Sequence, residues 1–310
     1  MPSPSCDIAS LIKSQARSLG FDACGFAAAL PVDDEAVSRY DDWVTQGHNG
    51  CMAWAEGHRD LRQDPSLLLP GARTVISLAL NYYPARFQPP GTLRVAYYAY
   101  GRDYHEVLRE KLMSLARYIE ETTRCATRPC VDSAPIRERY WAQQAGLGFV
   151  GRNNCLILPG KGSFYFLGEI VTTAQLPPDE PCRMTCGDCG NCIKACPSGA
   201  LNQIGAADAS RCLSCLLIEN HDEALPAWVG DVVGDRVVGC DECQLCCPHN
   251  AHATATTIAD FAPTQAVMNL TRASIESMTP GQFKRTFAHS AISRLRFKTL
   301  LRNATLIPHK

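Results

Sequence analysis

Cysteine spacing constrains this chain more than any other feature. Ten of its 17 cysteines lie between Cys186 and Cys247. The block from Cys186 to Pro197 reads C-x2-C-x2-C-x3-C-P, the run in which bacterial ferredoxins hold one [4Fe–4S] cluster with three thiolates and send the fourth to a second cluster. A second block, G-C-D-E-C-Q-L-C-C-P, ends at Pro248. The pattern predicts two clusters, which need eight thiolate ligands.

Spacing divides these ligands into two sets. The first cysteine set joins three thiolates of the first block to the Cys-Pro cysteine of the second: Cys186, Cys189, Cys192 and Cys247. The second cysteine set joins the crossing cysteine to the C-x2-C pair of the second block and to one cysteine of the intervening R-C-L-S-C stretch: Cys196, Cys212, Cys240 and Cys243. We therefore predict that each block contributes its Cys-Pro cysteine to the cluster of the other.

Two neighbouring thiols leave alternatives open. Cys246 adjoins Cys247, and Cys215 lies three residues after Cys212, so either could replace its neighbour. Cys247 is favoured because a proline follows it, as one follows Cys196. Structural zinc also uses paired C-x2-C motifs, but the C-x2-C-x3-C-P extension favours iron–sulfur clusters.

The N-terminal sequence and the apolar stretches bear on location. The first residues show neither a basic and apolar leader nor a twin-arginine pair, and apolar stretches such as Thr74–Leu80 are too short to span a bilayer. We therefore expect a cytoplasmic protein with no membrane attachment. Its thiols should stay reduced, which disfavours disulfides as the role of the cysteine blocks.

The last forty residues are basic, although the whole chain has a net charge of −1. This C-terminal basic segment, Thr271–Lys310, has one acidic residue, Glu276, against eight basic residues, a net charge of +7. The basic residues are Arg272, Lys284, Arg285, Arg294, Arg296, Lys298, Arg302 and Lys310. Such a segment is typical of polyanion binding, or of a solvated helix face, and both interpretations stay open.

Apolar periodicity predicts a mixed domain before the cysteine blocks. The predicted helices are Asp7–Leu19, Asp34–Gln46, Asp103–Glu121 and Ile136–Ala145, and the predicted strands are Asp22–Ala27, Thr74–Asn81, Pro129–Val131 and Phe164–Thr173. This alternation favours an α/β or α+β sandwich over residues 1–175. Prolines at positions 177, 178 and 181 predict a linker into a cysteine module at 176–255, and residues 256–310 form a helical, basic segment.

A ferredoxin needs only a cysteine module, yet more than half of this chain precedes it. We therefore expect the clusters to deliver electrons to a site in the N-terminal domain, and three stretches there are candidate site segments. Gly101–His105 lies at the start of a predicted helix. Its backbone N–H groups could bind an anion, or Asp103 could be the N-cap of the helix. Val131–Pro135 places Asp132 after a strand, as a proton donor or as the N-cap of the next helix. The glycines of Gly146–Asn154 allow close backbone approach to a ligand.

Together these motifs resemble the epoxyqueuosine reductase family. The sequences V-D-S-A-P, A-G-L-G-F-V-G-R-N, G-S-F-Y-F-L-G-E-I, the first cysteine block, R-C-L-S-C-L-L-I-E and the second block follow in order, and the resemblance covers about residues 10–305. It implies an α+β fold, in which a nitroreductase-like α/β domain binds cobalamin, a ferredoxin-like module binds two [4Fe–4S] clusters and a short helical C-terminus follows.

The activity that the resemblance implies is an oxidoreductase reaction in queuosine biosynthesis. Epoxyqueuosine at the wobble position of tRNA is reduced to queuosine, with electrons passing from the clusters to cobalamin. The implied partners are the anticodon stem-loop of the tRNA and an electron donor such as flavodoxin or ferredoxin. The alternatives are a reductive dehalogenase-like corrinoid iron–sulfur enzyme and an electron-transfer iron–sulfur protein.

Carried over by position, the family's cluster ligands fall on the two cysteine sets, and its catalytic acid falls on Asp132. We expect burial against the corrin to raise the pKa of Asp132. The implied cobalamin contacts are Arg62, Asp132, Leu156, Leu167, Ser214 and Asp241. Cys215 replaces a residue that tends to be aromatic in the family, and Cys246 replaces an apolar one.

The remaining histidine and cysteine residues receive plainer interpretations. His105 is a poor cobalt ligand, since the chain lacks the D-x-H-x-x-G pattern. Seven further cysteines have no metal spacing among themselves and are interpreted as buried or idle thiols: Cys6, Cys24, Cys51, Cys125, Cys130, Cys155 and Cys182.

Overall fold

The computed structural model describes residues 4–201 and 207–307, apart from the side chains of residues 4–6, which include Cys6. Its α-helices are α1 Pro4–Ser18, α2 Asp34–Thr45, α3 Arg59–Gln63, α4 Pro65–Leu68, α5 Tyr104–Thr123, α6 Glu138–Gln144, α7 Asn191–Ala195, α8 Leu213–Ile218, α9 Trp228–Val232, α10 Glu242–Leu245, α11 Gln265–Met268, α12 Arg272–Glu276, α13 Pro280–Thr286 and α14 Phe297–Thr305. The strands are β1 Ala23–Ala28, β2 Thr74–Asn81, β3 Arg94–Val95, β4 Thr127–Cys130, β5 Phe149–Val150, β6 Leu156–Ile157, β7 Tyr165–Thr172 and β8 Arg236–Val238, and short 3₁₀ turns are η1 Ala53–Ala55, η2 Tyr97–Ala99, η3 Pro248–Asn250, η4 Ala259–Phe261 and η5 Ala291–Arg294.

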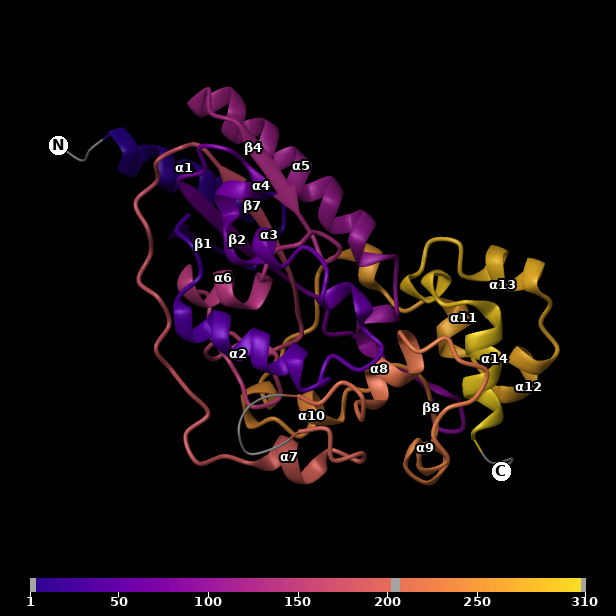
Figure 1. Ribbon diagram of the computed structural model, residues 1–310. Helices are drawn as coiled ribbons and strands as arrows, with labels where there is room; N and C mark the ends of the chain where they lie inside the picture. Colours follow the sequence, from indigo (N-terminus) through magenta and orange to yellow (C-terminus); the bar gives the residue numbers. More distant parts are fainter. Residues whose placement is uncertain (1–3, 202–206, 308–310) are drawn as a thin grey trace.

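A four-stranded antiparallel sheet organises the N-terminal half, in the order β1-β2-β7-β4. Every residue of β2 is buried, since helices cover both faces of the sheet. On one face, Ile12 of α1 and Leu112 of α5 pack on Ile76 and Leu78. On the other face, Trp141 of α6 packs on Val75. This three-layer sandwich, visible in Figure 1, confirms the predicted α+β class.

The predicted helices and strands of this half are all present within a few residues of their expected bounds, and β2 has the bounds that were predicted. Asp103 caps α5, since its side chain accepts a hydrogen bond from the backbone N–H of His105. The N-cap of α6 is Arg137. The N-cap interpretation of Asp132 is therefore wrong, and its carboxylate is available for another role.

The linker predicted from its prolines runs along the outer edge of the sheet (Figure 1). Asp179 binds the edge strand β1: its carboxylate accepts from Phe26 N, its own N–H donates to Phe26 O, both at 2.8 Å, and Lys13 pairs with the carboxylate at 2.5 Å. The linker thus covers backbone groups that an edge strand would otherwise expose.

A second apolar core lies under the C-terminal helices. It joins α11–α14 to α8, α9 and β8, and it includes residues 93–100 from the N-terminal half. The parallel β3–β8 pair connects the same two parts of the chain. The boundaries near residues 175 and 255 stay a prediction. Within the described residues, no helix is long and apolar enough to cross a membrane.

Candidate active site between the sheet and the cysteine module

The first cysteine set surrounds one small pocket. Cys186, Cys189, Cys192 and Cys247 line it together with Arg152, Asn153, Ile157, Asn191, Pro248 and His249. In the described part of the chain, no three His, Cys, Asp or Glu side chains converge on the position of a single metal ion. Four thiols around one shared space are the ligands that a [4Fe–4S] cluster needs.

The thiols of the second cysteine set are also neighbours. Cys212 lies at the N-terminus of α8, Cys243 lies within α10, and Cys240 precedes α10. Burial raises the pKa of Cys212, and the charge of nearby Cys196 adds to this rise. Burial likewise raises the pKa of Cys240, and the charge of nearby Cys212 adds to it. The structure therefore brings together the four residues that spacing grouped.

The two spare thiols have other partners. Cys246 donates a weak hydrogen bond to the carbonyl of Cys243 at 3.6 Å and is not among the residues around the pocket that Cys247 lines. Cys215 has its sulfur 3.3 Å from that of Cys51. These contacts favour Cys247 and Cys212 as the ligands, as the sequence did.

The glycine-rich stretch approaches the cysteine loops. Arg152 donates from its backbone N–H to Cys186 Sγ at 3.5 Å, and its guanidinium donates to the carbonyls of Cys189 and Gly187 at 2.9 and 3.0 Å. Asn153 Nδ2 donates to the carbonyl of Cys243 at 3.2 Å. The loop between β5 and β6 thus contacts both cysteine blocks, and N–H···S bonds of this kind tune the potential of a cluster.

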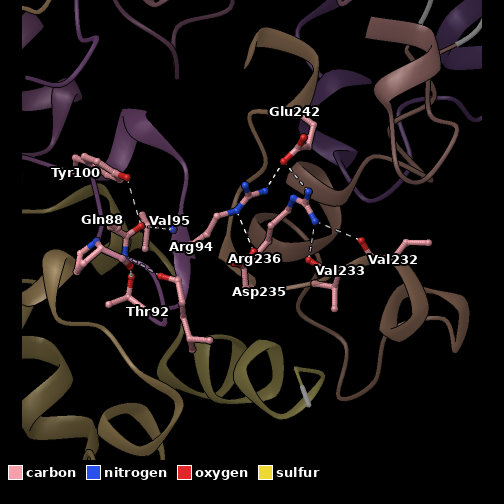
Figure 2. A network of polar contacts seen from close by, with 12 residues as sticks. Gln88, Thr92, Arg94, Val95, Tyr100, Val232, Val233, Asp235, Arg236 and Glu242 are labelled. Atoms are coloured by element: carbon pink, nitrogen blue, oxygen red, sulfur yellow. Dashed lines mark hydrogen bonds and ion pairs between the residues drawn. The ribbon is translucent and has the colours of Figure 1, made fainter. Parts of the chain in front are cut away.

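Ion pairs fix the helix that carries Cys243. Glu242 accepts hydrogen bonds from Arg94 of β3 and from Arg236 of β8, the latter at 2.6 Å (Figure 2). Arg94 also pairs with Asp235 at 2.9 Å. Because β3 belongs to the N-terminal half, this network ties α10 to it. A cavity of about 210 Å³ opens beside the network, lined in part by Tyr97, Cys240 and Asp241.

Asp132 forms the outer end of a chain of polar side chains. Its Oδ2 lies 2.5 Å from His105 Nε2, and His105 Nδ1 lies 2.6 Å from Asp103 Oδ1. Arg294 Nε donates to Asp103 Oδ2 at 2.9 Å. The side chains of Asp103 and His105 are 7% and 5% exposed, whereas that of Asp132 is 49% exposed. Of the two carboxylates in this polar chain, Asp132 is therefore the one that a ligand can reach.

The directions of the pKa shifts favour a proton on His105 over one on either carboxylate. Burial raises the pKa of Asp132, but the hydrogen bond and charge of His105 outweigh it and leave that pKa below its usual value. The expected rise in the pKa of Asp132 on burial against the corrin stays a prediction, because this direction applies to the chain alone. Burial likewise opposes ionisation of Asp103, yet His105 and Arg294 bring its pKa down to about 2. Burial lowers the pKa of His105, and its bonds to both carboxylates overcome this and raise it.

Both ring nitrogens of His105 are engaged by carboxylates, so neither is available to a metal. This agrees with the expectation that His105 is a poor cobalt ligand. Its partnership with Asp132 was missed from the sequence, because 27 residues and a long helix separate the two. The signal was present in Asp103-Tyr104-His105, which combines a helix cap with a histidine two positions further on.

Two more carboxyl groups lie behind Asp132, and neither was among the residues predicted from the sequence. Glu138 accepts from the backbone N–H of Asp132 at 2.7 Å, and this supports the left-handed φ of 42° at Asp132. Burial and then the charge of Asp132 raise the pKa of Glu138 to about 7. Glu169 of β7 is fully buried and accepts from Ser77 Oγ at 3.0 Å. Burial and then the charge of Glu138 raise its pKa well above the usual value.

Several residues expected to contact cobalamin lie near the end of the sheet. β4 pairs with β7 through Cys130 and Glu169, so the turn that carries Asp132 begins at the end of the sheet where β7 carries Leu167. Leu156 and Leu167 belong to one apolar cluster. Leu156 follows Cys155, whose thiol donates a weak hydrogen bond to the carbonyl of Asn153 at 3.7 Å. The interpretation of Cys155 as a buried or idle thiol stays a prediction.

The other expected contacts divide between the cysteine module and a separate helix. Both Ser214 and Asp241 belong to the cysteine module: Ser214 lies two positions after Cys212, and Asp241 directly follows Cys240. Arg62 of α3 instead stacks on Trp54 at 5.3 Å and donates to its carbonyl. The partly buried Leu167, the half-exposed Asp132 carboxylate and the polar residues next to the second cysteine set are groups of the kind that suit a corrin, which is a largely apolar ring with a polar rim. The residues present fit this group.

Comparison with known proteins gives a consistent answer. A family model described as "Epoxyqueuosine reductase QueG, DUF1730" matches residues 62–133, and a "4Fe-4S double cluster binding domain" matches residues 185–250. A curated epoxyqueuosine reductase of Gloeobacter violaceus is 42% identical over 96% of this chain and 94% of its own length. One of Salmonella typhimurium is 38% identical over 96% of this chain and 79% of its own.

Solved structures agree with these relatives. A crystal structure of epoxyqueuosine reductase with an epoxyqueuosine-modified tRNA-Tyr stem loop has a TM-score of 0.90 and 30% identity, and the match covers 97% of this chain and 81% of that one. The enzyme of Bacillus subtilis, with its catalytic aspartate loop swung out of the active site, has a TM-score of 0.89, 30% identity and the same coverage. The double-cluster match favours clusters over zinc.

Proposed function

Because this chain belongs to the epoxyqueuosine reductase family, we propose that it reduces epoxyqueuosine in tRNA to queuosine, with the Asp132–His105 pair as its proton source. The observation that carries this proposal is the half-exposed Asp132 carboxylate, which lies at the end of the sheet and is hydrogen-bonded to a buried histidine. The dehalogenase and electron-transfer alternatives are not favoured by the relatives.

The chain's own residues hold the redox groups of the family. We assign the first and second cysteine sets to the two clusters and the backbone near Leu156 and Leu167 to cobalamin, with Asp132, Ser214 and Asp241 at its rim. When bound, the clusters and the cobalt centre supply the two electrons of the reaction one at a time. Arg62 remains a proposed contact that would reach the cofactor from α3.

Proton supply is the task of the acid pair. Converting an epoxide to an alkene releases the oxygen as water, which takes two electrons and two protons. Asp132 lies at the outer end of the polar chain, so we assign it the hydrogen bond to the leaving oxygen. The His105 imidazolium passes one proton through Asp132, and solvent water supplies the second by protonating His105 again. Asp103 holds the ring in orientation, as a buried carboxylate orients the histidine of a catalytic triad.

The tRNA partner is supported by the solved complex with a modified stem loop and by exposed cations on this chain. Lys284, Arg285, Arg296 and Lys298 of the C-terminal basic segment are all at least partly exposed. We assign them to backbone phosphates of the anticodon stem-loop, where sequence-independent contacts position the substrate. A cytoplasmic location and a flavodoxin or ferredoxin as electron donor stay predictions.

The test is conversion of epoxyqueuosine-containing tRNA by the anaerobically reconstituted holoprotein and a chemical reductant, followed by mass spectrometry of the nucleosides. Asp132→Asn should retain both clusters and bound cobalamin yet lose about 10²- to 10⁴-fold in rate, the usual contribution of a general acid. Asp231→Asn, an exposed carboxylate on α9, is the matched control. Full activity of Asp132→Asn would remove Asp132 from the mechanism.

A further inference from the structure

A close thiol pair joins the N-terminal half to the cysteine module. Cys51, in the loop between α2 and η1, has its sulfur 3.3 Å from that of Cys215 on α8, although 164 residues separate them in the chain. A disulfide has an S–S length of about 2.05 Å, so bond formation requires the sulfurs to approach by about 1.2 Å. Side-chain rotation can supply much of such a change.

The two thiols differ in accessibility. Cys51 is exposed, whereas Cys215 is buried. A soluble oxidant therefore meets Cys51 first, and Cys215 is positioned behind it as a resolving thiol.

Hydrogen bonds hold the loop that carries Cys51 against the segment that leads into α8, so the fold keeps the two thiols close together. Trp43 Nε1 donates to the carbonyl of Ala207, and Ala209 N donates to the carbonyl of His48, both at 2.8 Å. Gly50 has a φ of +56°, and a Cβ at this position would lie 2.7 Å from Ser210 N. A glycine directly before Cys51 is thus what allows the loop to approach the segment that leads into α8.

Cys215 is separate from the cluster ligands in function but close to them in space. It lies one helical turn after Cys212, which belongs to the second cysteine set. The Cys215 thiol serves none of the ligand roles assigned above.

We propose that Cys51 and Cys215 form a reversible intramolecular disulfide under oxidising conditions, with glutathione disulfide as a sufficient oxidant. The Cys51 thiolate attacks glutathione disulfide and releases one glutathione, and the Cys215 sulfur then attacks Cys51 Sγ and releases the second. Two protein thiols and one glutathione disulfide thus yield one protein disulfide and two glutathione molecules, and electrons and protons balance. The bond ties the N-terminal half to α8.

This modification site is independent of the proposed tRNA reaction. Because intracellular disulfides are rare and mostly redox-responsive, such a bond would report oxidising conditions at the element that carries Cys212. Conversely, a reducing glutathione pool would leave both thiols free.

The test uses the anaerobically reconstituted holoprotein, incubated with glutathione mixtures of increasing oxidised fraction, blocked with N-ethylmaleimide and digested without reduction. We expect a cross-linked peptide that contains Cys51 and Cys215, lighter by two hydrogens than its parts, which dithiothreitol removes. Iron content should stay constant, and the thermal midpoint should rise by a few degrees while the bond is present.

Two variants keep the test sharp. Cys51→Ser should abolish the cross-link and the thermal shift, whereas Cys125→Ser, which removes a partly buried thiol between α5 and β4, should leave both unchanged. Stable glutathionylation of Cys51 with Cys215 still reduced would overturn the proposal. So would iron loss before the disulfide appears, or pairing of either thiol with a different cysteine.

Discussion

Replacement of Asp103 by asparagine tests whether the His105 proton drives the reaction. The Asp103→Asn change would keep the shape of the side chain, the cap on α5 and an oxygen that accepts from His105 Nδ1, and it would remove only the negative charge. The raised pKa of His105 means that the acid form is complete at low pH and that activity falls as pH rises through that pKa. Losing the charge of Asp103 lowers the pKa of His105, so the fall should begin at lower pH.

The size of this change follows from the hydrogen bond. A bond to a charged group contributes about 1.5–3 kcal/mol and one between neutral groups about 0.5–1.5 kcal/mol, so the variant destabilises the imidazolium by about 1–1.5 kcal/mol. Since about 1.36 kcal/mol equals one pH unit, the basic limb should move down by about one unit. Little solvent screening applies, because both side chains are more than nine-tenths buried.

The assay is the single-turnover rate of epoxyqueuosine loss from tRNA as a function of pH. On the acidic plateau the variant should match the unaltered protein, and above both limbs it should be about tenfold slower, which is the rate equivalent of one pH unit. Arg294→Gln is the matched control, because it removes the half-exposed cation on the other side of Asp103 and should move the limb slightly upward. An unmoved limb, or an equal loss at every pH, would show that Asp103 only orients the ring.

A buried carboxyl group, a cluster-side arginine and two surface cations each support one further prediction. Glu169→Gln should raise the thermal midpoint increasingly above about pH 5: the raised pKa of Glu169, which faces Ser77 and Glu138, makes wild-type stability fall by up to about 1.4 kcal/mol per pH unit as pH rises above its unfolded value, and equal midpoints at all pH values would refute this. Arg152→Gln should lower the midpoint potential of the first cluster in a redox titration followed by electron paramagnetic resonance, because a cation beside the cluster favours its reduced state; an unchanged potential would contradict the contact. The double change of Arg296 and Lys298 to serine should reduce the salt dependence of tRNA binding by about one to two phosphate contacts, measured as the slope of log affinity against log salt, and an unaltered slope would place the tRNA elsewhere.

The sequence predicted the features that depend on residues close together in the chain: the buried strand, the cysteine sets and the position of Asp132. The strand Thr74–Asn81 is a continuous apolar run, and a fully buried strand between two helical layers is what such a run forms. The cysteine sets were predictable because cluster ligands follow fixed spacings within short loops. Asp132 followed from a motif, and its position after a strand was readable from the apolar residues before it.

Long-range contacts were the part that the sequence could not predict. His105 meets Asp132 because α5 and β4 are adjacent in the fold, and no periodicity encodes that pairing. For the same reason, the sequence could not predict that His105 lowers the pKa of Asp132 in the chain alone. Cys51 was likewise interpreted singly, whereas its thiol partner, Cys215, lies far along the chain.

The C-terminal basic segment shows why a charge count overestimates a binding surface. Arg272 donates to the carbonyl of Ile307 and pairs with Glu276, and Arg302 donates to the carbonyls of Leu216 and Asp222, so both act as structural ties between helices. Arg294 is committed to Asp103. Only a part of the segment's charge therefore faces outward for phosphates, and Arg294 connects that outward face to the acid pair. A tRNA phosphate that drew Arg294 away from Asp103 would strengthen the hold of Asp103 on the His105 proton, so substrate binding and proton supply would be linked through one guanidinium.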